Sequence, residues 1–445
     1  MSKRQEKSTI LKRAKRYGAV GGKLSGVVAK AATQRLLGIA VDQSTEAKAL
    51  RAALGGLKGP LLKIAQILGT IPDALPEQYV QELRQLQSNA PSMGWVFVKR
   101  RMQGELGPDW QTQVREFGQV AAHAASLGQV HRAITKTGDD VACKLQYPDM
   151  QSAVDADLQQ LKIILGIYKN IHGGVDTADV YAEVTDRLRE ELDYTREAKH
   201  MALFAHMLRD EAMVHIPKFY PDLSTPRLLT MQWLDGKRVL DFKDAKQSVR
   251  DTIARNMFRA WYVPFYHYGV IHGDPHLGNY TLRDDLSVNL LDYGCVRVFP
   301  STFVKGVLDL YLAIRDDKPD LAVAAYQAWG FKNLTKELIA VLNLWARFLY
   351  GPILQDKVVD IAEHNAGKAG QVVAQRVHAE LKRIGGVRPP REFVFMDRAA
   401  VGLGSVFIHL RSKLNWHQMF GELNAQFDAQ KLAKAQGAAL KTVGL

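Results

Sequence analysis

Two segments decide the fold: VIHGDPHLGN at residues 270–279 and LLDYG at residues 290–294. Asp274 and Asn279 stand five positions apart, and Asp292 follows thirteen positions after Asn279, behind an apolar run and before Gly294. Mg²⁺ is a hard cation that takes a few carboxylate or amide oxygens and completes its shell with phosphate oxygens and water. The two segments together predict a phosphate-transfer site that holds Mg²⁺ through Asn279 and Asp292.

The order of these residues is that of a kinase catalytic loop, in which the first aspartate orients or deprotonates the acceptor. Asp274 takes that position. The alternative is an ordinary hairpin in which Asp and Asn serve only the turns. The second segment, with Asp292 at the expected spacing, favours the catalytic interpretation.

Composition and charge set wide bounds. The 445 residues are 47% apolar and 24% charged, which is ordinary for a folded chain of roughly two or three domains. The net charge of +13 favours anionic partners, whether nucleotides, acidic membrane surfaces or nucleic acid, and cannot choose among them. Cys143 and Cys295 are the only cysteines, so no disulfide framework supports the fold and a reducing compartment is expected.

The N-terminal segment, residues 1–40, is strongly basic and has no apolar core of the kind that signal peptides carry. No apolar run in the sequence reaches the roughly 18 residues of a transmembrane helix, so we expect a soluble or peripheral protein. Apolar residues between Tyr17 and Ala31 recur at helical spacing, which would let one side lie on an anionic bilayer. A solvated basic tail and an organelle transit peptide are the alternatives.

Residues 45–88 are predicted to form helices, because apolar residues recur every three or four positions from Leu54 to Leu68. Lys63 and Gln66 lie three positions apart and share a face of that helix. On a helix, such side chains usually do no more than face solvent.

Residues 121–146 predict two strands joined by a turn at Thr137-Gly138-Asp139-Asp140. Small residues before the first strand would let backbone amides approach phosphates, although alanine replaces most of the glycine of an ordinary kinase loop. Lys144, in Val-Ala-Cys-Lys on the second strand, resembles the kinase lysine that contacts the α- and β-phosphates. The expected nucleotide-binding residues are Ala124, Ala125, Ser126, Gly128, Val130 and Lys144.

Residues 178–208 predict one long charged helix. Glu197 on it can pair with Lys144, as the third-helix glutamate does in kinases, while Asp193 shares its face. Glu191 would point elsewhere, because it lies about 240° around the helix from Glu197. A salt-bridged surface helix is the alternative.

The next segments place the catalytic stretch within a larger unit. Short strands follow up to Trp233, and residues 234–237 form a turn where a kinase hinge would join two lobes. Residues 249–268 predict a core helix with Trp261, Phe265 and Tyr266. Beyond Gly294 a helix begins after a few residues, so the long segment on which protein kinases present a peptide is absent from the sequence.

Four motifs together resemble the ABC1/UbiB/COQ8 (AarF) family of atypical kinases over residues 20–415. They are Leu61 to Leu68, the alanine-rich stretch from Ala124 to His131, Glu191-Leu192-Asp193-Tyr194, and the catalytic loop. The resemblance implies an α+β, protein-kinase-like two-lobed fold, with a small β-containing N-lobe, a helical C-lobe and an N-terminal helical extension over the cleft. The expected domains are a basic segment at 1–40, the extension at 41–110, the N-lobe at 111–235 and the C-lobe at 236–445.

The resemblance also implies roles for single residues. Lys63 and Gln66 would belong to the occluding extension, with Glu191 and Asp193 as their partners. Catalytic roles would fall to Asp274 and to the Lys144–Glu197 pair, and metal binding to Asn279 and Asp292. Two departures stand out: Ala65 replaces the family glycine and adds a methyl group, and Tyr293 replaces the usual phenylalanine after the metal aspartate.

By this resemblance, the chain is expected to bind ATP or ADP with Mg²⁺ and to support ubiquinone (coenzyme Q) or related prenyl-lipid biosynthesis. Expected partners are the nucleotide, an anionic membrane surface or prenyl-lipid intermediates, and quinone-biosynthesis proteins, with no nucleic acid. The expected location is the cytoplasm, peripheral on the inner membrane, or the mitochondrial matrix side in a eukaryote. The alternatives are a small-molecule phosphotransferase of the aminoglycoside or choline kind and a nucleotide-gated scaffold without turnover.

Overall fold

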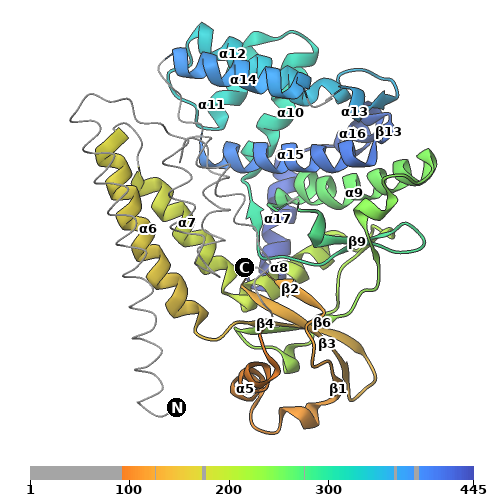
Figure 1. Cartoon of the computed structure of the whole chain (residues 1–445). Helices are drawn as coiled ribbons and strands as arrows, with labels where there is room; N and C mark the ends of the chain where they lie inside the picture. The colour runs from red at the N-terminus through yellow and green to blue at the C-terminus, as the bar shows by residue number, and fades with distance from the viewer. Residues whose placement is uncertain (1–92, 126, 173–176, 275, 365–367, 385–389) are drawn as a thin grey trace. The chain divides into compact units, whose positions relative to one another are not determined.

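The computed structural model describes residues 93–125, 127–172, 177–274, 276–364, 368–384 and 390–445 (Figure 1). The chain divides into two compact units. Unit 1 takes the chain up to Tyr194 together with Pro221–Thr230, and unit 2 takes Thr195–Tyr220 and Met231–Leu445. Each unit is therefore assembled from two separate stretches. The domain boundaries expected from the sequence stay a prediction.

Unit 1 contains the antiparallel sheet that the sequence predicts around Lys144. Its strands run in the order β1-β3-β4-β6, and β2 pairs with β3. The turn between β3 and β4 includes Gly138 at φ +91°, a backbone conformation that glycine adopts without strain. The two strands and their Gly/Asp turn are confirmed. The bounds are β1 (Val114–Phe117), β2 (His123–Ala125), β3 (Gly128–Thr135), β4 (Asp140–Gln146) and β6 (Leu228–Gln232), whose last two residues belong to unit 2.

The single long helix expected over residues 178–208 is wrong, because two helices stand there. Unit 1 contains α5 (Trp95–Leu106), α6 (Met150–His172) and α7 (Thr177–Glu191). The next helix, α8 (Tyr194–Met207), begins three residues after α7 ends and belongs to unit 2 from Thr195 onward. Tertiary hydrogen bonds divert the backbone at the break. The carbonyl of Leu192 accepts from Gln146 Nε2 at 2.6 Å, and the amide of Tyr194 donates to the carbonyl of Pro226 at 3.3 Å.

Unit 2 holds its strands in small sheets. One has the order β5-β10-β9-β7, and two further pairs are β11-β8 and β12-β13. The bounds are β5 (Val214–His215), β7 (Lys237–Arg238), β8 (Val270–His272), β9 (Tyr280–Leu282), β10 (Val288–Leu290), β11 (Val296–Val298), β12 (Val359–Asp360) and β13 (Lys413–Leu414).

The rest of unit 2 is helical, as expected for a kinase C-lobe. The helix predicted before the catalytic stretch is present as α9, with Trp261, Phe265 and Tyr266 buried in the core. The helices of unit 2 after α8 are α9 (Gln247–Tyr268), α10 (Ser301–Arg315), α11 (Pro319–Ala328), α12 (Lys336–Tyr350), α13 (Ile361–His364), α14 (Lys368–Arg383), α15 (Arg391–Leu410), α16 (Trp416–Asn424) and α17 (Ala429–Val443).

Gly269 ends α9 and starts the catalytic strand β8. Its φ of +64° is left-handed, and a Cβ at this position would lie 2.7 Å from the carbonyl oxygen of Phe299. Only glycine satisfies both conditions without rearrangement. The turn therefore delivers β8, and with it Asp274, at a defined place beside β11.

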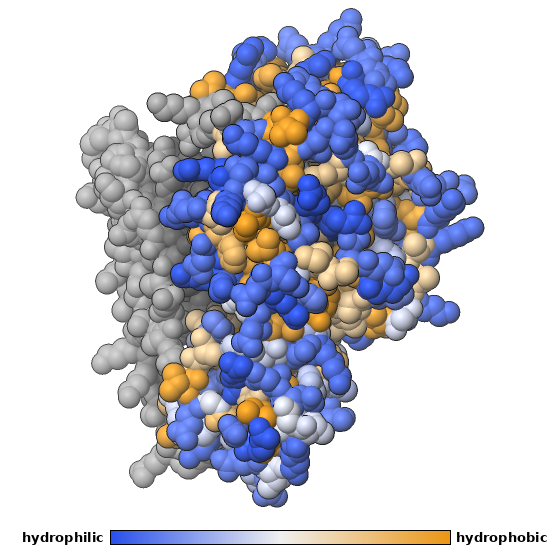
Figure 2. All heavy atoms as spheres, turned by 90° about the vertical axis from the view of Figure 1, so that its right-hand side faces the viewer, coloured by the Kyte–Doolittle hydropathy of each residue, from blue (hydrophilic) through white to orange (hydrophobic). Residues whose placement is uncertain are grey.

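The surface of the described residues is mostly hydrophilic on the face seen in Figure 2, with scattered hydrophobic side chains. Single exposed apolar residues are normal on folded proteins. Among the described helices, none combines the length and apolar content that a membrane crossing needs.

Candidate functional site

Two strand pairs in unit 2 bring the three predicted site residues into neighbouring loops. β8 and β11 pair with Val296 opposite His272, and the amide of Gly273 donates to the carbonyl of Cys295 at 2.6 Å. β9 and β10 pair with Leu290 opposite Tyr280. Just beyond that pair, the amide of Leu291 donates to the carbonyl of Asn279 at 3.0 Å. Asn279 and Asp292 therefore flank one end of the same hairpin.

His272 links the loop of Asp274 to that of Asp292. Its Nε2 lies 2.6 Å from the carbonyl oxygen of Asp292, and its Nδ1 lies 3.3 Å from the backbone nitrogen of Asp274. A carbonyl only accepts and an amide only donates, so Nε2 carries the proton and Nδ1 is the acceptor. The buried imidazole thus ties the backbone of Asp274, the predicted catalytic residue, to the backbone of Asp292, a predicted metal ligand.

Asn279 is tied directly to the loop of Asp274. Its Nδ2 donates to the carbonyl of Asp274 at 3.1 Å. An amide has one donor end and one acceptor end, so this bond fixes where Oδ1 points. Because the donor end is used within the loop, the oxygen is the end that can serve a cation.

Asp292 is oriented by a bond to its own turn. Its Oδ1 accepts from the amide of Gly294 at 3.0 Å. The described residues contain no cluster of three or more His, Cys, Asp or Glu side chains that could hold a metal by itself. An amide oxygen and a carboxylate, completed by phosphate and water oxygens, form the donor set that Mg²⁺ commonly uses. The residues present fit Mg²⁺ on a nucleotide.

Tyr293 replaces the usual phenylalanine without leaving its hydroxyl unsatisfied. The ring is fully buried, and the hydroxyl donates to the carbonyl of Leu290 at 2.9 Å. Burial raises the pKa of this phenol well above its ordinary value, and the nearby charges of Asp292 and Glu197 act in the same direction. Tyr293 is therefore a neutral core residue that donates one hydrogen bond.

The predicted nucleotide-binding residues of unit 1 lie on or beside a tight hairpin. Ala124 and Ala125 are in β2, and Gly128 begins β3 opposite Ala125. Ser126 lies outside the described residues. A Cβ on Gly128 would lie 2.0 Å from the carbonyl oxygen of Leu145, so this position excludes every side chain. Val130 stands directly opposite Lys144 in the β3–β4 ladder, which puts the two side chains on one face of the sheet.

Lys144 is buried, and its Nζ lies 5.3 Å from the centre of the Tyr194 ring. This cation–π contact joins the lysine to the end of the Glu191-Leu192-Asp193-Tyr194 motif. Glu191 is the last residue of α7 and Asp193 precedes α8, so both belong to the break between the helices. Glu197 is buried on α8 in unit 2, whereas Lys144 belongs to unit 1. Their ion pair stays a prediction.

Sequence reasoning missed the residues that support the hairpin from behind. Gln129 is buried and pairs with the backbone of Met93: the amide of Met93 donates to Oε1 at 2.6 Å, and Nε2 lies 3.3 Å from the carbonyl of Met93. Gln129 Nε2 also lies 2.7 Å from His131 Nε2, and His131 Nδ1 lies 2.7 Å from the carbonyl of Gly118. The available signal was a pair of polar residues, Gln129 and His131, two positions apart on a strand.

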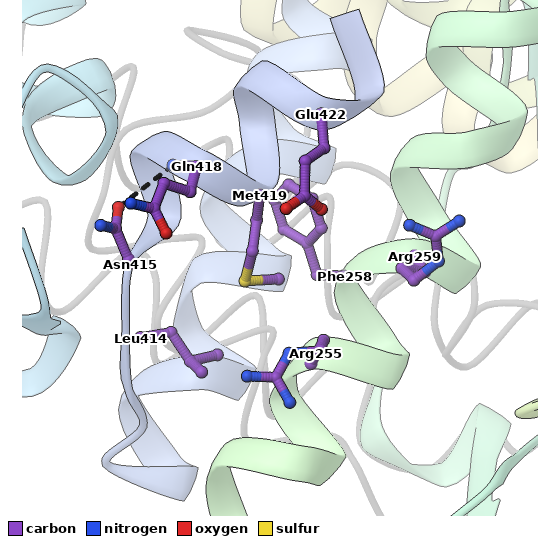
Figure 3. A pocket seen from close by; sticks show the side chains of 8 residues that line it. All are labelled: Arg255, Phe258, Arg259, Leu414, Asn415, Gln418, Met419 and Glu422. Carbon is purple, nitrogen blue, oxygen red and sulfur yellow. Dashed lines mark hydrogen bonds between the residues drawn. The ribbon is translucent and has the colours of Figure 1, made fainter. Parts of the chain in front are cut away.

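Some predicted residues are outside the described part of the chain, and a cavity in unit 2 involves none of the predicted site residues. Lys63, Gln66 and Ala65 fall outside the described residues. A cavity of about 160 Å³ in unit 2 lies between α9 and α16, and Figure 3 shows its lining. None of the predicted site residues lines it. The lining residues are Arg255, Phe258, Arg259, Leu414, Asn415, Gln418, Met419 and Glu422.

The chain is similar to a known family and to named proteins. The model of the ABC1 atypical kinase-like domain matches residues 85–323. Atypical kinase COQ8, mitochondrial, from Saccharomyces cerevisiae is 27% identical over 381 residues, which are 83% of this chain and 74% of that protein. Protein ACTIVITY OF BC1 COMPLEX KINASE 7, chloroplastic, from Arabidopsis thaliana is 32% identical over 269 residues, which are 60% of this chain and only 39% of that relative.

One solved structure extends the likeness to the fold. The complex of Rv3197 with erythromycin, from Mycobacterium tuberculosis, matches with a TM-score of 0.59 and 25% identity, over 83% of this chain and 93% of that one. The expected two-lobed, kinase-like α+β fold is confirmed. With more than half of its residues matched by the family model, the chain belongs to the ABC1 atypical kinase-like family.

Proposed function

We propose that this chain is an atypical kinase or ATPase that binds ATP or ADP with Mg²⁺ and supports ubiquinone or related prenyl-lipid biosynthesis at a membrane surface. The observation that carries the proposal is the convergence of Asp274, Asn279 and Asp292 in adjoining loops. Hydrogen bonds through His272 and Asn279 hold those loops together. Such preorganised groups are what phosphoryl transfer requires of a protein.

Each group of unit 2 has a role in this proposal. Asn279 Oδ1 and the Asp292 carboxylate hold the cation, and the chemistry that Mg²⁺ supplies when bound is neutralisation of phosphate charge. Asp274 orients the attacking hydroxyl or water and accepts its proton. His272 keeps Asp274 and Asp292 in register through their backbone atoms.

Unit 1 contributes the phosphate-facing groups. Lys144 contacts the α- and β-phosphates and pairs with Glu197, while the β2–β3 hairpin offers backbone amides from Ala124, Ala125 and Gly128. The methyl groups of the alanines limit close approach, so this hairpin holds phosphates differently from a glycine-rich loop. Lys63 and Gln66, with Glu191 and Asp193, restrict access in this proposal.

The proposed role in ubiquinone or prenyl-lipid biosynthesis is supported by the similarity to named proteins. The yeast relative is named an atypical kinase COQ8 of mitochondria, and the net charge of +13 suits an anionic membrane surface. Adding anionic liposomes and a quinone precursor to purified protein should therefore stimulate ATP hydrolysis. Lack of stimulation by either addition would remove the membrane and lipid part of the proposal and leave the nucleotide part standing.

A substitution of Asp292, the proposed metal ligand, tests nucleotide binding. Asp292→Asn should weaken Mg²⁺-dependent binding of a fluorescent ADP analogue by at least about tenfold, because one carboxylate ligand is lost. Asp244→Asn, at an exposed position, is the matched control. Equal binding by wild type and Asp292→Asn would disprove the assigned metal site.

Turnover is tested separately with Asp274→Asn. This variant should keep nucleotide affinity and lose ATP hydrolysis, because binding does not need the proton acceptor. If Asp274→Asn still supported quinone synthesis in cells, the chain would act as a nucleotide-gated scaffold.

A small-molecule phosphotransferase is the second candidate. Only residues 295–300 separate Gly294 from the start of α10 at Ser301, and β11 occupies half of them. So short a link leaves no platform for a peptide, which favours a small acceptor. A screen of soluble alcohols would support this candidate through stoichiometric phosphorylation of one of them.

A further inference from the structure

One face of α8 packs against the segment that carries Asp292. His200 lies three residues after Glu197 and four before Phe204, so the three share a helix face. The Phe204 ring lies 5.6 Å from that of Tyr293, and His200 Nδ1 lies 3.1 Å from the carbonyl oxygen of Tyr293. His200 is 4% exposed, so water does not compete for this bond.

The direction of the His200 bond follows from its partner. A carbonyl oxygen can only accept, so His200 Nδ1 carries the proton and donates. His272 donates in the same way to the carbonyl of Asp292. Two histidines from different elements, α8 and β8, therefore hold two consecutive carbonyls of the metal-binding segment.

We infer that His200 is a positioning residue that sets the Mg²⁺ affinity of the nucleotide site by fixing the Asp292–Tyr293 backbone. The inference rests on the proposed function, because it concerns the same metal site. His272 fixes the peptide after Asp292, and without His200 the next peptide, between Tyr293 and Gly294, can rotate. The Asp292 carboxylate would then leave the orientation that its bond to Gly294 defines. Loss of a group that orients a metal ligand typically costs about 10–100-fold in metal affinity.

A pair of substitutions separates the hydrogen bond from the space that the ring fills. Asparagine places an amide donor one bond from Cγ, where histidine has Nδ1, whereas leucine has no donor. His200→Leu should raise the Mg²⁺ concentration for half-maximal binding of a fluorescent ADP analogue by about 10-fold or more. His200→Asn should recover most of the Mg²⁺ affinity that His200→Leu loses. His206→Leu, half-buried on the same helix, should behave as wild type.

The measurement is a Mg²⁺ titration of nucleotide binding to the full chain, with thermal unfolding recorded in the absence of Mg²⁺. A Mg²⁺ midpoint unchanged in His200→Leu, or an equal shift in the Leu and Asn variants, would overturn the role of the hydrogen bond. If wild-type protein bound no nucleotide with Mg²⁺, the proposed function itself would fail, which is a distinct outcome. A folded His200→Leu variant with a raised midpoint supports the inference.

Discussion

The loops that hold Asp292 and the β2–β3 hairpin are built by opposite means. In the loops of unit 2, histidine side chains hold backbone carbonyls, and polar side chains are the predicted functional groups. In the hairpin of unit 1, the front consists of small residues, and Gly128 has no room for even a Cβ. Its polar side chains, Gln129 and His131, lie behind the strand on the face opposite Val130 and Lys144.

The difference teaches where each region is sensitive. The β2–β3 hairpin depends on the lack of a side chain at Gly128 and on the buried hydrogen bonds of Gln129 and His131. The loops around Asp292 depend on histidine donors that reach backbone carbonyls. Substitutions in the hairpin should therefore change mainly the stability of unit 1. Loss of His200, His272 or Asp292 in unit 2 should change metal and nucleotide binding more than stability.

The largest effect is expected from Gly128→Ala. The new methyl group would meet the Leu145 carbonyl at 2.0 Å, so the β3–β4 pairing must shift, at a cost of about 3 kcal/mol in the free energy of unfolding. Gly104 in α5 is the matched control, because a Cβ there meets nothing within 4 Å. Gly104→Ala should stabilise by roughly 0.5–1 kcal/mol. Denaturant unfolding measures both, and equal effects would contradict the tight contact.

Gln129→Leu comes next. It removes the partner of the Met93 amide and of His131, which leaves buried polar groups unsatisfied and should cost about 2 kcal/mol. Gln103→Leu, at an exposed position on α5, should change the stability by no more than about 0.5 kcal/mol. Denaturant unfolding of both variants is the measurement. A Gln129→Leu variant as stable as the control would show that the hydrogen bonds of Gln129 to Met93 and His131 do not stabilise the fold.

Tyr293→Phe tests the loops of unit 2. The hydroxyl bond to Leu290 is lost, so the free energy of unfolding should fall by about 1 kcal/mol. Nucleotide affinity should hardly change, because phenylalanine fills the same space. Tyr280→Phe is the control, since the Tyr280 hydroxyl lies at the long distance of 3.5 Å from the Asp274 carbonyl. A large loss of Mg²⁺-dependent binding in Tyr293→Phe would give the hydroxyl a functional role.

The smallest effect is a pH dependence from His131. Burial lowers its pKa below the ordinary 6.5, against the opposing effect of the Gly118 hydrogen bond. The unfolded chain then binds the proton more readily, so stability is present above pH 6.5 and declines as the pH falls below it. His131→Asn should flatten this decline in unfolding measured from pH 7.5 downward in small steps. A wild-type stability that rose on acidification through this range would contradict the neutral, buried state.

Much of this molecule could be predicted from sequence because its signals are local. The Gly/Asp turn, the apolar strands on either side and the core helix before Val270 depend on nearby residues, and the structure has all three. The break at Leu192 could not be predicted in the same way. Its backbone groups bond to Gln146 and Pro226, which are far away along the chain.

The sequence by itself determined the family, the order of the elements and which residue types could hold phosphate and Mg²⁺, because spacing and chemistry are properties of the chain. Only the tertiary structure decided that His272 and His200 hold consecutive carbonyls beside Asp292, and that Gln129 anchors Met93 behind the hairpin. Hydrogen bonds between distant segments depend on which strands and helices become neighbours. The sequence does not indicate which carbonyl a histidine or glutamine side chain will contact in the folded protein.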